Sequence, residues 1–208
     1  MIVMKPVVEV NGSADFALWP VSVVPDFSFQ PLHGGLTPAE VGTAVLAIAS
    51  ANRIRSHDGE DDDRAFASAT ALLQGLLTPE DLVAFGGLQV TDTGTGVVFN
   101  PACCDGLESW RDWYAVPQGG ELWYGHPPLS PHADGNGRSV RLTVDAEDPA
   151  SAVIELTHGE LERLLAGVER DLADFRALAA AWAAERLPEG YAEPVAVALA
   201  RLFAGESA

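Results

Sequence analysis

The sequence predicts an α+β protein with N-terminal helices, an antiparallel sheet of about four to six strands, and a long C-terminal helix that covers the sheet. Three observations predict this class. A strong helix-start signal stands at residues 37–40, polar and apolar residues alternate over residues 140–144, and apolar residues over 161–182 follow a four-three spacing. Helical signals therefore come first and last, and most strand signals lie between them.

The first elements are predicted from β-branched runs and a capping signal. Residues 7–10 and 21–24 are valine-rich runs bounded by Gly, Pro and Asp, which is typical of short strands. Thr37 is a preferred N-cap residue, proline follows it at the first helical position, and Glu40 completes a capping box. A helix from this signal to about Ile54 is expected, with Val41, Val45, Ile48 and Ala49 facing inward.

An exposed loop and further helices follow. Residues 56–64 contain no apolar side chain, so they are expected to be solvated. A second helix is predicted from about Ala65 to Leu77. Residues 78–81 repeat the Thr-Pro-x-acid start signal, which predicts a short helix that ends at the glycine pair 86–87.

The middle of the chain shows strand and turn signals. Residues 88–90 and 97–99 flank the turn-rich sequence TDTGTG, and this pattern predicts a hairpin. A short helix is predicted at 107–114 and a strand at 122–124. Residues 127–137 are rich in Pro, Gly, Asp and Asn, which predicts an exposed loop.

The C-terminal part is predicted as two strands and two helices. Residues 140–144 alternate with period two and predict a half-buried strand, and 152–156 predict another. Thr157 and Glu160 form a capping box for the long helix, and a final helix is predicted at about 193–203. The apolar stripe of the long helix consists of Leu161, Leu165, Val168, Leu172, Phe175, Ala179 and Trp182.

This organisation divides the chain at residue 87. Residues 1–87 are predicted as a strand and helical region, and residues 88–208 as the antiparallel sheet with the long C-terminal helix. The two regions are also compatible with one continuous domain. The stripe on the long helix either packs on the sheet or pairs with a second copy, so a monomer or a homodimer is expected.

Charge bounds the kinds of partner. The 208-residue chain carries 30 acidic and 12 basic residues, for a formal net charge of −18. Phosphate backbones repel such a surface, so nucleic-acid binding is not expected. A basic protein would be attracted over long range, although net charge also serves solubility alone. No apolar run reaches the roughly 18 residues of a membrane span. No membrane segment is therefore expected. The N-terminal sequence MIVMKPVVEVNG lacks the basic and then apolar regions of a signal peptide, so a cytoplasmic protein is expected.

The block over residues 99–126 concentrates the rarer residue types. It holds both cysteines and three of the five tryptophans. Tryptophans three residues apart share a helix face, and an arginine beside them matches the composition of binding hot spots. The size of an indole favours the other interpretation, which predicts that Trp110 and Trp113 are both mostly buried and pack against the long C-terminal helix around Phe175. The candidate binding residues are Trp110, Arg111, Trp113, Trp123 and His126.

The same block offers a weaker case for catalysis. Cys103 and Cys104 precede the helix predicted at 107–114, where a helix N-terminus stabilises a thiolate, and His126 is a candidate base. Neighbouring acids oppose thiolate formation, and no C-x-x-C spacing for zinc occurs. We therefore expect two free thiols, no catalytic residue, no bound metal and no cofactor.

The sequence resembles a family of uncharacterised actinobacterial proteins. The segments that carry the resemblance are TGTGVVFNPACCDGLESWRDW, LWYGHPP, VRLTVD and IELTHGELERLLAGVERDLADF, within residues 88–182. That family pairs a Cys-Cys-x-Gly-Leu-Glu-x-Trp-Arg-x-Trp block with a Trp-x-Gly-His-x-Pro block. The resemblance implies a small cytoplasmic α+β protein of an immunity-like, protein-binding kind, and it transfers no catalytic residue.

The favoured interpretation is a non-enzymatic module that binds a protein partner, such as an immunity or inhibitor protein against a basic effector. Two alternatives remain open. One is an enzyme with its site around Cys103, Cys104 and His126. The other is a small-ligand binding protein with a tryptophan-lined cleft.

Overall fold

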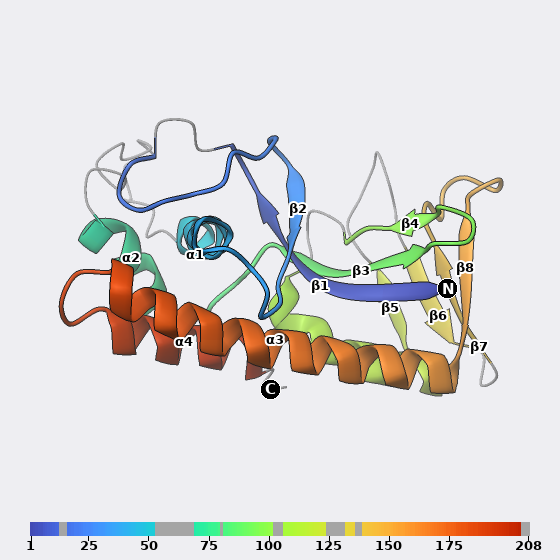
Figure 1. Ribbon diagram of the computed structural model, residues 1–208. Coiled ribbons are helices and arrows are strands. Elements are labelled where there is room, and N and C mark those ends of the chain that lie inside the picture. Colours follow the sequence, from blue (N-terminus) through green and yellow to red (C-terminus); the bar gives the residue numbers. More distant parts are fainter. Residues whose placement is uncertain are drawn as a thin grey trace, which may run out of the picture. The chain divides into compact units, whose positions relative to one another are not determined.

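The structure is a computed structural model, and it describes residues 1–12, 16–52, 69–79, 81–101, 106–123, 132–135 and 139–204 (Figure 1). By internal contacts the chain forms two compact units, and each draws on separate stretches of sequence. Unit 1 contains Met1–Val7 and Phe85–Asp171. Unit 2 contains Val8–Ala84 and Leu172–Ala208. The division between residues 1–87 and 88–208 stays a prediction.

Within the described residues, the elements combine two sheets with four α-helices and a 3₁₀ helix. The first sheet has the strand order β2-β1-β3-β4, and the second has the order β5-β6-β7-β8. The predicted α+β class is confirmed, with the strands divided between two antiparallel sheets. The elements are β1 (Ile2–Val10), β2 (Ser28–Pro31), α1 (Pro38–Ala51), α2 (Ala69–Leu77), β3 (Gly86–Asp92), β4 (Val98–Phe99), η2 (Leu107–Gln118), β5 (Glu121–Trp123), β6 (His132–Gly135), β7 (Ser139–Thr143), β8 (Val153–Thr157), α3 (His158–Arg186) and α4 (Ala192–Ala204).

The second sheet, in unit 1, is apolar on one face. In its register Ala133 pairs with Leu142, and Leu142 pairs with Ile154. These three side chains are buried, whereas Arg141 and Glu155, one position away, are exposed. The predicted period-two strand is therefore confirmed in β7. The 3₁₀ helix η2 contacts β5, β6 and β7, as well as β3 of the first sheet.

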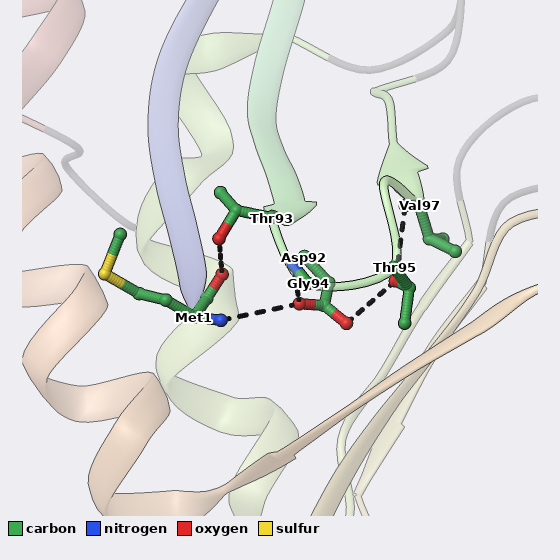
Figure 2. Close-up of polar contacts among 6 residues, drawn as sticks. All are labelled: Met1, Asp92, Thr93, Gly94, Thr95 and Val97. Carbon is green, nitrogen blue, oxygen red and sulfur yellow. Dashed lines mark hydrogen bonds and ion pairs between the residues drawn. The ribbon is translucent and has the colours of Figure 1, made fainter.

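The β3–β4 hairpin is organised by one carboxylate. Val90 pairs with Phe99 across the two strands, as the TDTGTG signal predicted. The Asp92 carboxylate accepts from the Gly94 backbone N–H at 2.9 Å and from the Thr95 hydroxyl at 2.8 Å (Figure 2). These bonds lower the pKa of Asp92. Asp92 therefore sets the turn through local side-chain to backbone bonds.

The same turn holds the beginning of β1. The Thr93 backbone N–H and hydroxyl both donate to the Met1 carbonyl, at 2.9 and 2.8 Å (Figure 2). The Met1 amino group lies 3.6 Å from the Asp92 carboxylate. Met1, the residue before β1, thus has backbone and charged partners on the β3–β4 turn.

Unit 2 contains the predicted first helix with its capping box. The Glu40 backbone N–H donates to the Thr37 hydroxyl, and the Thr37 backbone N–H donates to the Glu40 carboxylate. The predicted inward residues of α1 are all buried. The helix ends at Ala51, before the expected Ile54, because the Asn52 amide bonds to the Ile48 and Val83 carbonyls. The inward residues are Val41, Val45, Ile48 and Ala49.

The long helix α3 also begins as predicted. The Glu160 backbone N–H donates to the Thr157 hydroxyl, and the Glu160 carboxylate accepts from the Thr157 backbone N–H at 2.9 Å. Every residue of the predicted stripe is buried. In unit 2 the Phe175 ring packs edge-on against Phe203 of α4, with centroids 6.0 Å apart. The stripe consists of Leu161, Leu165, Val168, Leu172, Phe175, Ala179 and Trp182.

Three local predictions are wrong. Residues 21–24 form no strand, because Ser22 donates its backbone N–H to the Thr43 hydroxyl on α1. Thr78 starts no helix; its N–H and hydroxyl both bond to the Gln74 carbonyl, so it closes α2. The expected 127–137 loop contains β6, whose polar residues are held by pairing on both edges, with β5 and β7.

The helices in the described ranges include none that is both long enough and apolar enough to cross a bilayer.

Candidate functional site

The tryptophan-rich helix η2 is built on a spacing of three. Its buried residues are Leu107, Trp110, Trp113 and Val116, each three positions from the next. A 3₁₀ helix has three residues per turn, so all four lie on one stripe. The spacing explains why this segment, predicted as an ordinary short helix, adopts the tighter form. A left-handed Gly119 (φ 91°) ends it.

Both indoles of η2 are core groups. Trp110 and Trp113 are each 2% exposed, which confirms the prediction that they are mostly buried. The Trp113 ring meets the Phe99 ring edge-on, with centroids 6.1 Å apart and planes at 88°. Their predicted packing near Phe175 stays a prediction. Neither indole offers a partner more than a small fraction of its surface.

Of the three predicted residues on η2, Arg111 is the one with a partly exposed side chain. Its guanidinium carbon lies 4.4 Å from the centre of the Trp110 ring, in a cation–π arrangement. Its Nη2 lies 3.2 Å from Oε1 of Glu169 on α3, and the two side chains are 34% and 55% exposed. The arginine therefore joins the outer side of η2 to the first half of α3, within unit 1.

Tyr114 lies beside Trp110 and near Arg111 and Glu169, and the sequence analysis did not identify it. Its ring centroid lies 6.1 Å from that of Trp110, and 38% of the residue is exposed. Burial raises the pKa of the Tyr114 hydroxyl, the negative charge of Glu169 raises it further, and Arg111 opposes this. The signal was its position, four residues after Trp110 and three after Arg111.

We call Arg111, Tyr114 and Glu169 the η2 surface. It presents a guanidinium, a protonated phenol and a carboxylate side by side on two helices. These groups suit hydrogen bonds and ion pairs with a protein surface. Because the pKa of the Tyr114 hydroxyl is raised, the phenol stays protonated near neutral pH and does not serve as a base there.

The other predicted site residues are Trp123 and His126. Trp123 is the last residue of β5, and its backbone pairs with His132 of β6. The His132 Nδ1 lies 3.9 Å from the Asp134 carboxylate. His126 lies outside the described residues, as do both cysteines, so the predicted absence of a Cys–His centre stays a prediction. Among the described side chains, no three His, Cys, Asp or Glu residues are grouped to hold a metal ion.

Comparison with known proteins yields no relative. No protein-family model matches the sequence, and neither a curated protein nor a solved structure matches it significantly. The resemblance of residues 88–182 to actinobacterial immunity-like proteins therefore stays a prediction.

Proposed function

We propose that this protein is a non-enzymatic module that binds a basic protein, in the manner of an immunity or inhibitor protein acting in the cytoplasm. The observation that carries the proposal is the charge of the chain. Unit 1 contains 14 acidic and 6 basic residues, a net charge of −8, and unit 2 contains 16 acidic and 6 basic residues, a net charge of −10. Both units would thus attract the same class of partner.

Such a charge acts mainly on encounter. A summed negative field raises the association rate with a positive partner, and the effect weakens as salt screens it. Charge alone does not fix the geometry of a complex, which requires directional and apolar contacts. The η2 surface supplies directional groups in unit 1, because Arg111 and Tyr114 are residue types enriched at hot spots.

The core role of the two tryptophans also supports a binding module. Trp110 and Trp113 are taken up by packing, so they leave no indole wall for a ligand cleft along η2. The partly exposed groups of η2 and α3 are those that protein interfaces use. This favours a protein partner over a small ligand at this helix.

The test is a binding measurement with a basic protein encoded next to this chain's gene. We expect a 1:1 complex by isothermal titration calorimetry at 50 mM salt. Stopped-flow mixing should show an association rate constant that falls at least tenfold between 50 and 300 mM salt. A complex whose association rate is independent of salt contradicts electrostatic recruitment. Failure of every basic neighbour to bind at 50 mM salt contradicts the proposed function.

A further inference from the structure

A long irregular connection joins β1 to β2. Residues 11–27 separate the two strands, and the described part of this connection contains neither helix nor strand. Irregular connections longer than about 12–15 residues are uncommon in compact domains and usually carry function. We call residues 11–27 the β1–β2 connection (Figure 1, blue).

The middle of this connection is fixed to α1 and α3. The Trp19 indole N–H donates to the Gly42 carbonyl of α1 at 2.9 Å. Its ring meets the Trp182 ring edge-on, with centroids 5.7 Å apart. Gly42 permits this approach, because a Cβ there would collide with the Pro20 carbonyl. The Ser22 backbone N–H adds a bond of 2.8 Å to the Thr43 hydroxyl. These contacts hold the middle of the connection against the two helices.

The end of the connection, directly before β2, is held in a strained conformation. Phe27 has φ 56°, and it is the one non-glycine residue with positive φ in the described part of the chain. Its backbone N–H donates to the Asn11 side-chain oxygen at 3.2 Å. The Asp26 carboxylate accepts from the Gly12 backbone N–H at 2.6 Å, and the Ser28 hydroxyl donates to the Pro25 carbonyl at 2.7 Å. Bonds on both sides of Phe27 thus maintain its backbone.

The strained backbone conformation leaves an aromatic ring in solvent. Phe27 is 77% exposed, and Val23 is fully exposed. Pro25 and Asp26 between them are exposed as well. A bulky residue in the left-handed region is rare and costs conformational energy, and strain of this kind concentrates at binding sites. An exposed phenylalanine contributes little to a folded core, so folding alone does not account for the arrangement.

We infer that Val23, Pro25 and Phe27, the exposed apolar residues before β2, form the anchor that enters an apolar pocket of the basic partner. The inference rests on the proposed function and names the surface that carries it. A pre-formed loop loses little conformational freedom on binding, which favours affinity. Asp26 places a carboxylate beside the ring, so a cationic group at the rim of the pocket would complement it.

A second copy of this chain is a poor occupant. Two copies would each bring a net charge of −18 and an Asp26 beside the apolar ring. The repulsion between like charges opposes such pairing. The net charge of the chain and the Asp26 carboxylate therefore favour a basic partner over self-association.

The test uses the full chain and the same basic neighbour, measured by calorimetry at 50 mM salt. Phe27→Ala should weaken binding at least tenfold, because the aromatic anchor is lost. Phe27→Leu keeps an apolar side chain of similar reach and should stay within about threefold of the unsubstituted protein. Phe85→Ala removes another exposed phenylalanine, 50% exposed in unit 1, and serves as the matched control with an expected change below twofold.

The outcomes separate this inference from the function on which it rests. If the complex forms and Phe27→Ala binds as tightly as the unsubstituted protein, the anchor assignment is wrong while the binding function stands. If Phe27→Ala and Phe85→Ala weaken binding equally, the loss of affinity is not specific to the anchor residues before β2, and the assignment is also wrong. If no basic neighbour binds the unsubstituted chain, the proposed function fails, and the anchor fails with it. Circular dichroism of each variant confirms that the fold is retained.

Discussion

The Arg111 guanidinium lies over the Trp110 ring, with its carbon 4.4 Å from the ring centre. The contact places a charge on the outer side of an indole that is otherwise buried. The same guanidinium reaches Glu169 at 3.2 Å, so one side chain ties the 3₁₀ helix η2 to α3. Arg111 and Glu169 are 58 residues apart in sequence.

Removing the Arg111 guanidinium should cost modest stability. We expect Arg111→Ala to lower the free energy of unfolding by about 1 kcal/mol, mostly from the cation–π contact, because the half-exposed ion pair with Glu169 is screened by water. Urea denaturation followed by tryptophan fluorescence measures the change. The matched control, Arg186→Ala at the exposed end of α3, should stay within about 0.5 kcal/mol. Equal losses in the two variants would exclude a specific role for the contact with Trp110.

The Trp113–Phe99 pair should behave as core. Trp113→Ala should lower the free energy of unfolding by about 3–5 kcal/mol, since it opens a large cavity between η2 and the β3–β4 hairpin. A double-mutant cycle with Phe99→Leu should give a coupling energy of about 0.5–1.5 kcal/mol for the edge-on ring contact. Additive effects would show that the two rings do not stabilise each other. If Trp113→Ala does not fold, Trp113→Phe supplies the cycle.

The capping box of α3 predicts a pH dependence with a defined sign. Bonds from the Thr157 backbone N–H and hydroxyl lower the pKa of Glu160 in the folded protein. A carboxylate with a lowered folded pKa stabilises the fold above its unfolded pKa, and this stability is lost as pH falls through the folded pKa. Thr157→Ala should cost about 1 kcal/mol at pH 7 and less in acid. Chemical denaturation at pH 7 and pH 3 tests this, and a cost that grows in acid would contradict it.

The backbone of Phe27 predicts that its glycine and alanine variants differ in stability although both lose affinity. Phe27→Gly and Phe27→Ala both remove the ring, but only glycine adopts the left-handed conformation without strain. The glycine variant should therefore be more stable than the alanine variant by about 1 kcal/mol, while both lose affinity. Thermal unfolding compares the two. An alanine variant of equal or higher stability would show that residue 27 is not held in the left-handed region.

The two cysteines should be free thiols without enhanced reactivity. Adjacent cysteines form a disulfide only in a strained ring, so titration of the unfolded protein should find two thiols in each chain. The negative charges of Asp105 and Glu108 disfavour a thiolate, so they should keep the pKa values of the two thiols from falling. Labelling of the thiols by a thiol-reactive probe at neutral pH should therefore be slow. His126→Ala should leave the labelling rate unchanged. Rapid labelling that His126→Ala abolishes would support a Cys–His catalytic site.

Structural features that depend on a few neighbouring residues were predicted correctly from the sequence. The capping boxes at Thr37 and Thr157, the hairpin around Asp92 and the stripe of α3 all depend on spacings that one helix or turn satisfies by itself. The same holds for Trp110 and Trp113, whose burial follows from their size and shared face. The spacing of three from Leu107 to Val116 also contained the 3₁₀ form, although it was interpreted as an ordinary helix.

The sequence by itself thus determined the fold class, the caps, the buried stripes and the charge, because each depends on local geometry or on composition. Only the tertiary structure decided the rest. Residues 132–135 pair as a strand because strands lie on both edges, and Arg111 meets Glu169 because α3 brings it there. Phe27 is strained and exposed because Asn11 and Gly12, at the other end of the β1–β2 connection, bond to Phe27 and Asp26. Such contacts depend on where separate segments meet, which spacing along one segment does not encode.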